Sequence, residues 1–473
     1  MLGVLTGCGG SNSKTIEQPP LPVVTPPADD YIGIWQQTGY GQYLDITTEQ
    51  VNRYEASNDT CIQTHSISRD EFPTKFNWTV KEQDDERFVV HEHNVATIAH
   101  TLEKTTALPA SCSTLLENTP SNIVNHLVNM ANEYYAFFEV RNIDWQAASE
   151  LAISRVHDDM SSEQLKEVLI ELLAVFNDRH VILHAKAIDL FAPELSFEDI
   201  SIFGQVNDFD QQIINEYESL APSVSLEEYY STHLAAYYAA IHNKMDNGLK
   251  SKGGENNDKV AWGTIGDDVG YLYIGELEQF DPSQPASFGE ENIAPHIVAL
   301  NTVLDEAVAD LKHTSRLILD IRMHSGGTIS LDRTIAKRFI EQTINYGSFH
   351  AIGEQPRQLT MVPYDGERFT QETIIITSNF VQSSGEDMLM ALKADGDIIQ
   401  IGETTLGTFS DTLFLSLPNQ WAFSLSNQIW LDKDGNSWES IGIIPEHQLD
   451  VFTLEDRQLG VDSAINKALE LFQ

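Results

Sequence analysis

Short continuous apolar runs alternate with stretches of helical spacing after residue 265. The runs show no polar alternation, which is typical of strands covered on both faces. These expected strands lie at 269–274, 316–321, 373–377 and 397–401. Helices are expected between them near 294–312, 331–342 and 384–394, and a hairpin at 413–417 and 421–425. The pattern predicts an α/β fold for this part of the chain.

The preceding residues follow two other patterns. Between 31 and 115, short β-like runs are separated by turn signals, which predicts a small antiparallel β domain. From 121 to 176 the apolar residues have helical spacing, and residues 195–260 form an acidic segment expected to be helical. We therefore divide the chain into a tether at 1–30, a β domain at 31–117, a helical domain with an acidic insertion at 118–264 and an α/β core at 265–473.

Charge excludes one large class of partner. The chain has 28 basic and 71 acidic residues, a net charge of −43. Such a surface repels a phosphate backbone, so we expect no nucleic acid partner, and neutral or basic peptides are slightly favoured as ligands. No run of eighteen apolar residues is present, so no membrane span is expected.

The N-terminal residues resemble the end of a bacterial lipoprotein signal. Leu5-Thr6-Gly7 precede Cys8, and the Gly, Ser and Pro-rich stretch that follows has the composition of an extended tether. A signal peptide needs about 7–15 apolar residues and a basic region before its cleavage site, so we expect translation to start upstream of Met1. These residues predict export to the bacterial cell envelope with a lipid anchor on Cys8. The remaining pair, Cys61 and Cys112, then forms one disulfide by expectation.

Motifs for nucleotide, phosphate and zinc binding are absent, so we expect no cofactor and no metal. One place whose residues could carry out a reaction is Ser383-Ser384, which begins a helix after a strand. The N–H groups at a helix start favour an oxyanion, although either serine could simply cap the helix. A second is Gly326-Gly327 after a strand end, where N–H groups can approach a substrate or where the chain merely turns. A third is His180 at a helix-to-strand junction, a position at which a lone histidine is commonly structural.

Together these elements resemble the C-terminal processing (tail-specific) serine peptidase superfamily. The resemblance covers about 120–450 and is carried by five elements in order. They are Asp178-Arg179-His180, Asp320-x-Arg322 with Gly326-Gly327, Ser383-x-x-Glu386-Asp387, 401–407, and 438–446. It implies a spiral (crotonase/ClpP-like) α/β catalytic core, to which the helical segment and the β domain are added.

Within that superfamily the processing peptidases use a Ser–Lys dyad, and Thr408 stands at the position of the lysine. The chain is more similar to the branch of the tricorn core and interphotoreceptor retinoid-binding protein. That likeness implies Ser383 as nucleophile, His180 as base and Glu439 as its supporting carboxylate. The tricorn pattern places a relaying serine before the histidine, whereas this chain has Arg179.

The chemistry of these residue types agrees with those roles. A serine hydroxyl needs an adjacent base, and imidazole has a suitable pKa of about 6.5. A carboxylate near the imidazole stabilises its charged form. The N–H groups of Gly326 or Gly327 and of Ser384 would bind the oxyanion, each donor contributing about 2.7–4 kcal/mol.

The sequence thus predicts a serine endopeptidase that hydrolyses peptides or unfolded protein through an acyl-enzyme. Two alternatives stay open, because a fold does not fix a function. One is a non-catalytic ligand- or peptide-binding protein on the same scaffold. The other is a hydratase-like enzyme on the related spiral core, for which no acyl-thioester site is recognisable.

Overall fold

A computed structural model describes residues 31–71, 78–83, 87–92, 100–187, 200–204, 208–284, 290–396 and 398–473. Cys8 and the expected tether therefore lie outside the described residues. Within the described part, no helix combines the length and hydropathy needed to cross a bilayer.

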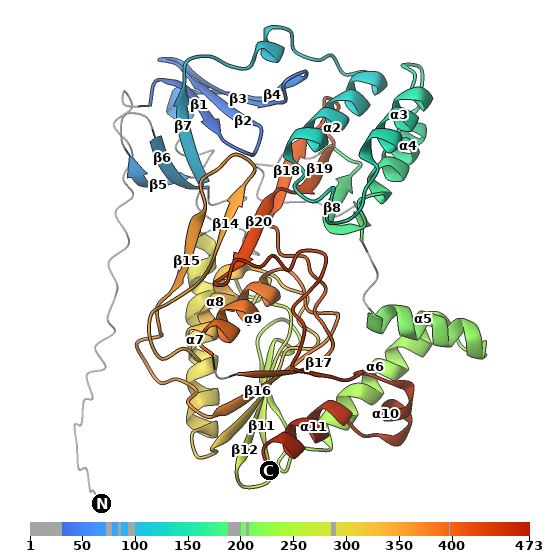
Figure 1. The fold of residues 1–473 in the computed structure, drawn as a ribbon, viewed down its shortest axis with the longest axis vertical. Coiled ribbons are helices and arrows are strands. Elements are labelled where there is room, and N and C mark those ends of the chain that lie inside the picture. The colour runs from blue at the N-terminus through green and yellow to red at the C-terminus, as the bar shows by residue number, and fades with distance from the viewer. Residues whose placement is uncertain are drawn as a thin grey trace, which may run out of the picture.

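An antiparallel seven-stranded sheet forms the N-terminal region, drawn in blue in Figure 1. Its strand order is β4-β3-β2-β1-β7-β6-β5. The bounds are β1 Gly33–Gln37, β2 Gln42–Ile46, β3 Gln50–Ala56, β4 Cys61–Ser68, β5 Trp78–Gln83, β6 Arg87–Glu92 and β7 His100–Thr105. Trp35, Leu44 and Val51, from three neighbouring strands, are buried in one cluster. Successive side chains of a strand point to opposite faces, so each strand contributes the residues of one face. The expected antiparallel strands are present, while the division of a β domain at 31–117 stays a prediction.

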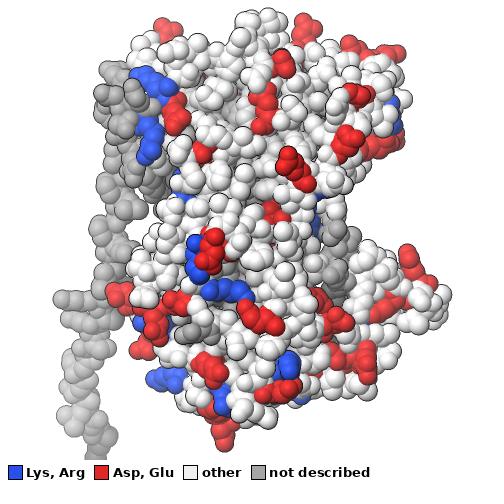
Figure 2. Space-filling view, viewed as in Figure 1, with Lys and Arg blue, Asp and Glu red and all other residues white. Residues whose placement is uncertain are grey.

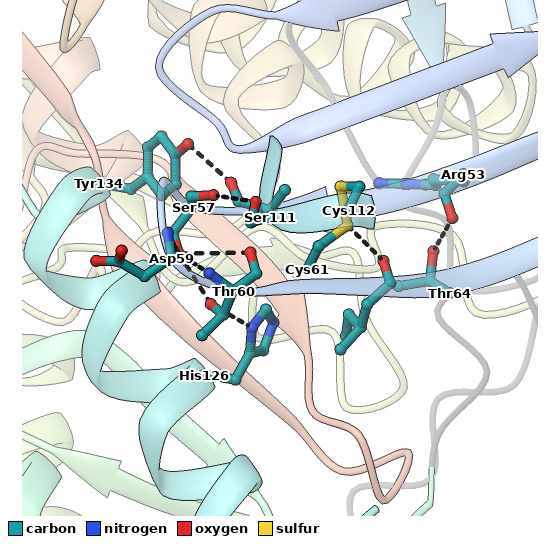
Figure 3. Close-up of a disulfide and its surroundings, with 12 residues drawn as sticks. Arg53, Ser57, Asp59, Thr60, Cys61, Thr64, Ser111, Cys112, His126 and Tyr134 are labelled. Atoms are coloured by element: carbon teal, nitrogen blue, oxygen red, sulfur yellow. Dashed lines mark hydrogen bonds between the residues drawn. A yellow bond between two sulfur atoms is a disulfide. The ribbon is translucent and has the colours of Figure 1, made fainter. Parts of the chain in front are cut away.

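A disulfide joins Cys61 at the start of β4 to Cys112 on the short 3₁₀ helix η2 (Ala110–Ser113). Ser111 Oγ donates to the carbonyl of Ser57 nearby (Figure 3). The bridge holds η2 against the edge strand of the sheet.

Three helices pack on a second, four-stranded sheet of order β18-β19-β8-β9. Each helix has an N-cap side chain, from Thr119, Asp144 or Ser161, that accepts a hydrogen bond from a free helical N–H. The helices are α2 Pro120–Tyr134, α3 Trp145–Arg155 and α4 Ser162–Ala174. The strands are β8 Asp178–His184, β9 Ile200–Phe203, β18 Thr412–Ser416 and β19 Ala422–Ser426. The expected hairpin is β18–β19, with Leu413 opposite Leu425.

The central sheet has the order β10-β11-β12-β13-β16-β17-β21, and it is parallel from β12 onward. Leu317 and Leu319 of β13 pack toward α7, α8 and α9, whereas Ile318 packs toward α6 and α11. The prediction of strands covered on both faces is confirmed. The strands are β10 Lys250–Lys252, β11 Val260–Ile265, β12 Val269–Ile274, β13 Arg316–Asp320, β16 Glu372–Thr377, β17 Ile399–Gly402 and β21 His447–Gln448. The helices are α6 Leu226–His242, α7 Glu290–Leu311, α8 Ile329–Ala336, α9 Ser384–Ala394 and α11 Ser463–Leu471.

Two smaller parts complete the fold. A three-stranded sheet, β15-β14-β20, connects the lower core to the upper region (Figure 1). The acidic segment contains helices as expected, α5 and α6, but it also forms the strands β9 and β10. Arg457 binds Glu216 with Nη2 to Oε1 at 2.6 Å. The bounds are β14 Ile344–Ala351, β15 Arg357–Met361, β20 Gln428–Asp432, α5 Asp208–Leu220 and α10 Leu454–Leu459.

The N-terminal sheet covers the outer edge of β18. Ser416 donates its N–H to Glu55 Oε2 at 2.5 Å, and Gln42 Nε2 lies 3.5 Å from the carbonyl of Phe414. Burial raises the pKa of Glu55. These side chains occupy hydrogen-bonding groups that an edge strand otherwise leaves open.

Some expectations differ from the structure. The helix expected at 331–342 is α8, which ends at Ala336, because the chain turns away there and Arg338 is buried against Asp305. The division at 264/265 stays a prediction, and β18–β19 cross it by pairing with β8. Acidic side chains are scattered over the face in Figure 2.

Candidate active site

Ser383 lies where the chain leaves the central sheet and enters α9. Its backbone has φ +56° and ψ −128°, a conformation that costs a residue with a side chain about 1–3 kcal/mol. Ser383 occupies the N-cap position, yet its side chain makes no capping hydrogen bond. Its N–H donates to the carbonyl of Thr408 at 3.0 Å, which helps to hold the strained turn. The hydroxyl therefore lies on a fixed turn and does not cap the helix.

The Gly326-Gly327 turn lies directly against this serine. A Cβ on Gly326, at φ +95°, would come within 2.9 Å of the Cβ of Ser383. A Cβ on Gly327, at φ +136°, would lie 2.5 Å from the carbonyl carbon of Leu277. Both the backbone angles and the space therefore require glycine at these positions.

Two backbone N–H groups beside Ser383 have no acceptor among the described residues, those of Gly327 and Ser384. The N–H of Gly326 instead donates to His324 Nδ1 at 3.1 Å. Of the three donors predicted for an oxyanion, the available pair is Gly327 and Ser384. Ser384 Oγ also donates to the carbonyl of Gly327 at 3.1 Å, which ties the helix start to the turn.

Glu386 braces the loop on the other side of the serine. Its carboxylate accepts from the N–H groups of Gly407 and Thr408, both at 2.7 Å, and from Thr405 Oγ1 at 2.5 Å. Burial raises its pKa to about 7, and these hydrogen bonds oppose that shift. Because Thr408 supplies the acceptor for the Ser383 N–H, Glu386 supports the Ser383 turn indirectly.

His180 is half-buried on β8. Its N–H donates to Asp178 Oδ1 at 2.9 Å, and its carbonyl accepts from Ser424 Oγ at 2.7 Å. Burial lowers the pKa of the imidazole, while Asp178, Asp411 and a hydrogen bond to the backbone of Ser410 act in the opposite direction. The ring is therefore neutral, and able to accept a proton, at neutral pH.

A single short segment connects Ser383 and His180. Thr408 accepts the Ser383 N–H, and the backbone of Ser410 contacts the His180 ring. The Cα atoms of residues two apart are separated by at most about 7 Å, so the Ser383 backbone and the His180 ring contact neighbouring positions of one segment. No hydrogen bond joins Ser383 Oγ to His180 among the described residues, which is common in uncomplexed serine hydrolases.

Glu439 contacts the backbone of the segment that lies against His180. Its Oε2 accepts from the N–H groups of Phe409 at 2.8 Å and Ser410 at 3.1 Å, and its Oε1 accepts from Arg141 Nη2 at 2.7 Å. Burial, followed by repulsion from Asp178, raises the pKa of Glu439 to about 8. The carboxylate thus holds the segment that touches His180.

Several of these residues had no role in the sequence analysis. Asp178 lies two positions before His180, a spacing that could have suggested contact on a strand. Arg141, Asp411 and His324 carry no local signal, because their contacts depend on how the chain folds. Among the described residues, no group of three or more acidic, histidine or cysteine side chains could hold a metal.

Residues 268–449 match the sequence model of peptidase family S41. No curated protein matches the chain. A structure from Parabacteroides merdae ATCC 43184, provisionally assigned as a peptidase, is 22% identical, with 75% of this chain and 97% of the other covered and a TM-score of 0.55. That likeness shows the fold.

Two further structures cover similar shares of the chain. Mature CPAF is 12% identical, with 75% of this chain and 96% of the other covered and a TM-score of 0.49. The photosystem II D1 C-terminal processing protease is 12% identical, with 74% and 99% covered and a TM-score of 0.40.

Proposed function

We propose that this chain, whose residues 268–449 match the model of peptidase family S41, is a serine endopeptidase acting through an acyl-enzyme on Ser383. The observation that carries the proposal is the strained Ser383 turn beside the two free N–H groups of Gly327 and Ser384. A strained residue with an uncommitted hydroxyl next to paired donors is the arrangement that acyl transfer requires.

The proposed reaction follows from these groups. His180 removes the proton from Ser383 Oγ, which attacks the scissile carbonyl carbon, and the two N–H groups bind the resulting oxyanion. The imidazolium gives its proton to the leaving amine as the C–N bond breaks. Water then attacks the acyl carbon with His180 again as base, the bond to Ser383 Oγ breaks as the imidazolium returns its proton to that oxygen, and the new carboxylic acid leaves. Asp178 and Asp411 stabilise the imidazolium by their charge.

Glu439 acts as a positioning residue in this scheme. We expect Glu439→Ala to lower kcat by up to about 10²-fold with little change in KM, because the 408–410 segment loses its carboxylate support. Steady-state kinetics on a peptide substrate measure the split. Glu446→Ala is the matched control, since Glu446 binds Lys393 at the sheet edge and is half exposed. Equal losses in the two variants would contradict the assignment.

Peptide hydrolysis itself is tested by incubating the protein with an unstructured polypeptide in ¹⁸O-labelled water. We expect fragments whose new carboxyl groups carry ¹⁸O and whose appearance needs Ser383. An intact polypeptide that co-elutes with the protein would instead support the non-catalytic binding alternative.

We also propose that the protein is exported to the cell envelope and anchored by a lipid on Cys8. The lipoprotein-like residues before Cys8 and the disulfide support this location, because disulfides persist in oxidising compartments. Expressed in a Gram-negative host with a longer upstream start, the protein should fractionate with membranes, and Cys8→Ser should not. Recovery of both forms in the soluble fraction would refute the anchor.

A further inference from the structure

His324 is a fully buried histidine whose two ring nitrogens are both engaged. Nδ1 accepts the N–H of Gly326 at 3.1 Å, and Nε2 donates to Asp332 Oδ1 at 2.8 Å. A nitrogen that accepts an N–H carries no proton, so this network fixes one tautomer of the neutral ring. His324 is therefore hydrogen-bonded at both ring nitrogens and differs from His180, whose Nδ1 has no partner among the described residues.

Asp332 is committed to this histidine. It lies in the first turn of α8 and is fully buried. Its Oδ1 binds His324, and its Oδ2 has no hydrogen-bond partner in the part of the chain that the structure describes. Burying a carboxylate costs free energy unless the group is paired, so the hydrogen bond to His324 is needed to offset the burial of Asp332.

The Gly326 N–H that His324 holds lies one residue before the free N–H of Gly327. Two adjacent glycines have wide backbone freedom, so an undirected turn would spread over several conformations. A side-chain acceptor bound to the N–H two residues later restricts a turn in the same way as an Asx-turn. The opposite face of the turn is fixed by Leu277, whose N–H donates to the carbonyl of Gly326 at 3.1 Å.

We propose that Asp332 and His324 form a positioning relay that fixes the Gly326-Gly327 turn and so aims the Gly327 N–H at the oxyanion. This inference rests on the proposed function of Ser383. The relay touches no reacting atom. Asp332 selects the tautomer in which Nδ1 can accept, and His324 transmits that choice to the turn.

Three substitutions at His324 separate this role from simple packing. Asn places a carbonyl oxygen close to the position of Nδ1, so His324→Asn should keep kcat within about fivefold of wild type. Gln and Leu offer no acceptor there, so His324→Gln and His324→Leu should lose at least tenfold in kcat. The upper limit is the ~10²–10³-fold loss known for removal of one such donor. KM should change little in all three.

Inhibition by a peptide aldehyde and by the matching peptide alcohol gives the specific readout. The aldehyde forms a tetrahedral adduct whose oxygen needs the donors, whereas the alcohol only occupies the site. His324→Leu should weaken inhibition by the aldehyde by the same factor by which it lowers kcat. It should leave inhibition by the alcohol unchanged. His126→Leu is the control, because His126 is equally buried and binds Thr60 far from the turn. It should lower the thermal midpoint only.

A double-variant cycle tests the order of the relay. In Asp332→Asn the amide can donate to Nε2 of His324 and favour the tautomer with its proton on Nδ1, which cannot accept the Gly326 N–H. Asp332→Asn should therefore lower kcat in the wild-type background. In the His324→Asn background no tautomer remains to be selected, and Asp332→Asn should have little further effect. Equal losses in both backgrounds, no loss in either, or a His324→Asn enzyme as poor as His324→Leu would overturn the relay. A wild-type protein without peptidase activity would instead overturn the proposed function.

Discussion

Ser383→Ala is expected to lower kcat for peptide hydrolysis by about 10⁶-fold, the loss found when a triad serine is removed. The reason is that alanine leaves no group to form the acyl-enzyme, while the two donor N–H groups stay in place. The thermal midpoint should change little, because Ser383 Oγ makes no hydrogen bond among the described residues. Single-turnover kinetics and thermal unfolding measure the two effects.

Ser384→Ala is the matched control for this variant. It keeps the Ser384 N–H and removes one hydrogen bond to the Gly327 carbonyl. We expect it to retain at least a tenth of the wild-type kcat, since a net hydrogen bond contributes about 0.5–1.5 kcal/mol. Comparable losses at the two serines would mean that the nucleophile is assigned wrongly.

His180→Ala should lower kcat/KM by about 10²–10⁴-fold, the contribution of a general base. The wild-type pH profile should also show an acid limb from this residue. Only the neutral ring accepts a proton, and burial lowers the pKa of the His180 imidazole. Activity should therefore persist at pH values below the ordinary imidazole pKa of about 6.5, and it should fall at still lower pH as the ring protonates. Measurement of kcat/KM against pH reports this limb for the free enzyme.

His184 on the same strand provides the control for His180. Burial lowers the pKa of His184 as well, and the centroids of the His184 and Phe414 rings lie 5.9 Å apart. His184→Ala should reduce stability and keep both the rate and the acid limb. An active His180→Ala enzyme with an unchanged pH profile would remove His180 from the mechanism.

The central sheet was predictable because its strands are apolar on both faces. Runs such as 269–274 coincide with β12, and the serine-bearing helix begins at Ser384 as expected. The strands β14 and β20 were missed, since they are half polar and pair only with each other and with β15. The pairing of β18–β19 with β8 was also missed, because pairing between segments so far apart leaves no local signal.

The candidate site was predictable only where one segment carries its own chemistry. Ser383 and the glycine turn could be found locally as candidates, although the same residues also fit a helix cap and a simple turn. His180 and Glu439 came from the family resemblance, and their contact through Ser410 required the fold. The engagement of the Gly326 N–H by His324 is a property of backbone geometry, which no residue pattern reports.

Labelling with a fluorophosphonate probe, followed by peptide mass spectrometry, tests the central claim most directly. The probe phosphonylates a serine only when a base and oxyanion donors activate it. The account predicts one modified residue, Ser383, with labelling strongly slowed in His180→Ala and nearly unaffected in His184→Ala. Modification of another serine, or active hydrolysis with Ser383 unlabelled, would contradict it.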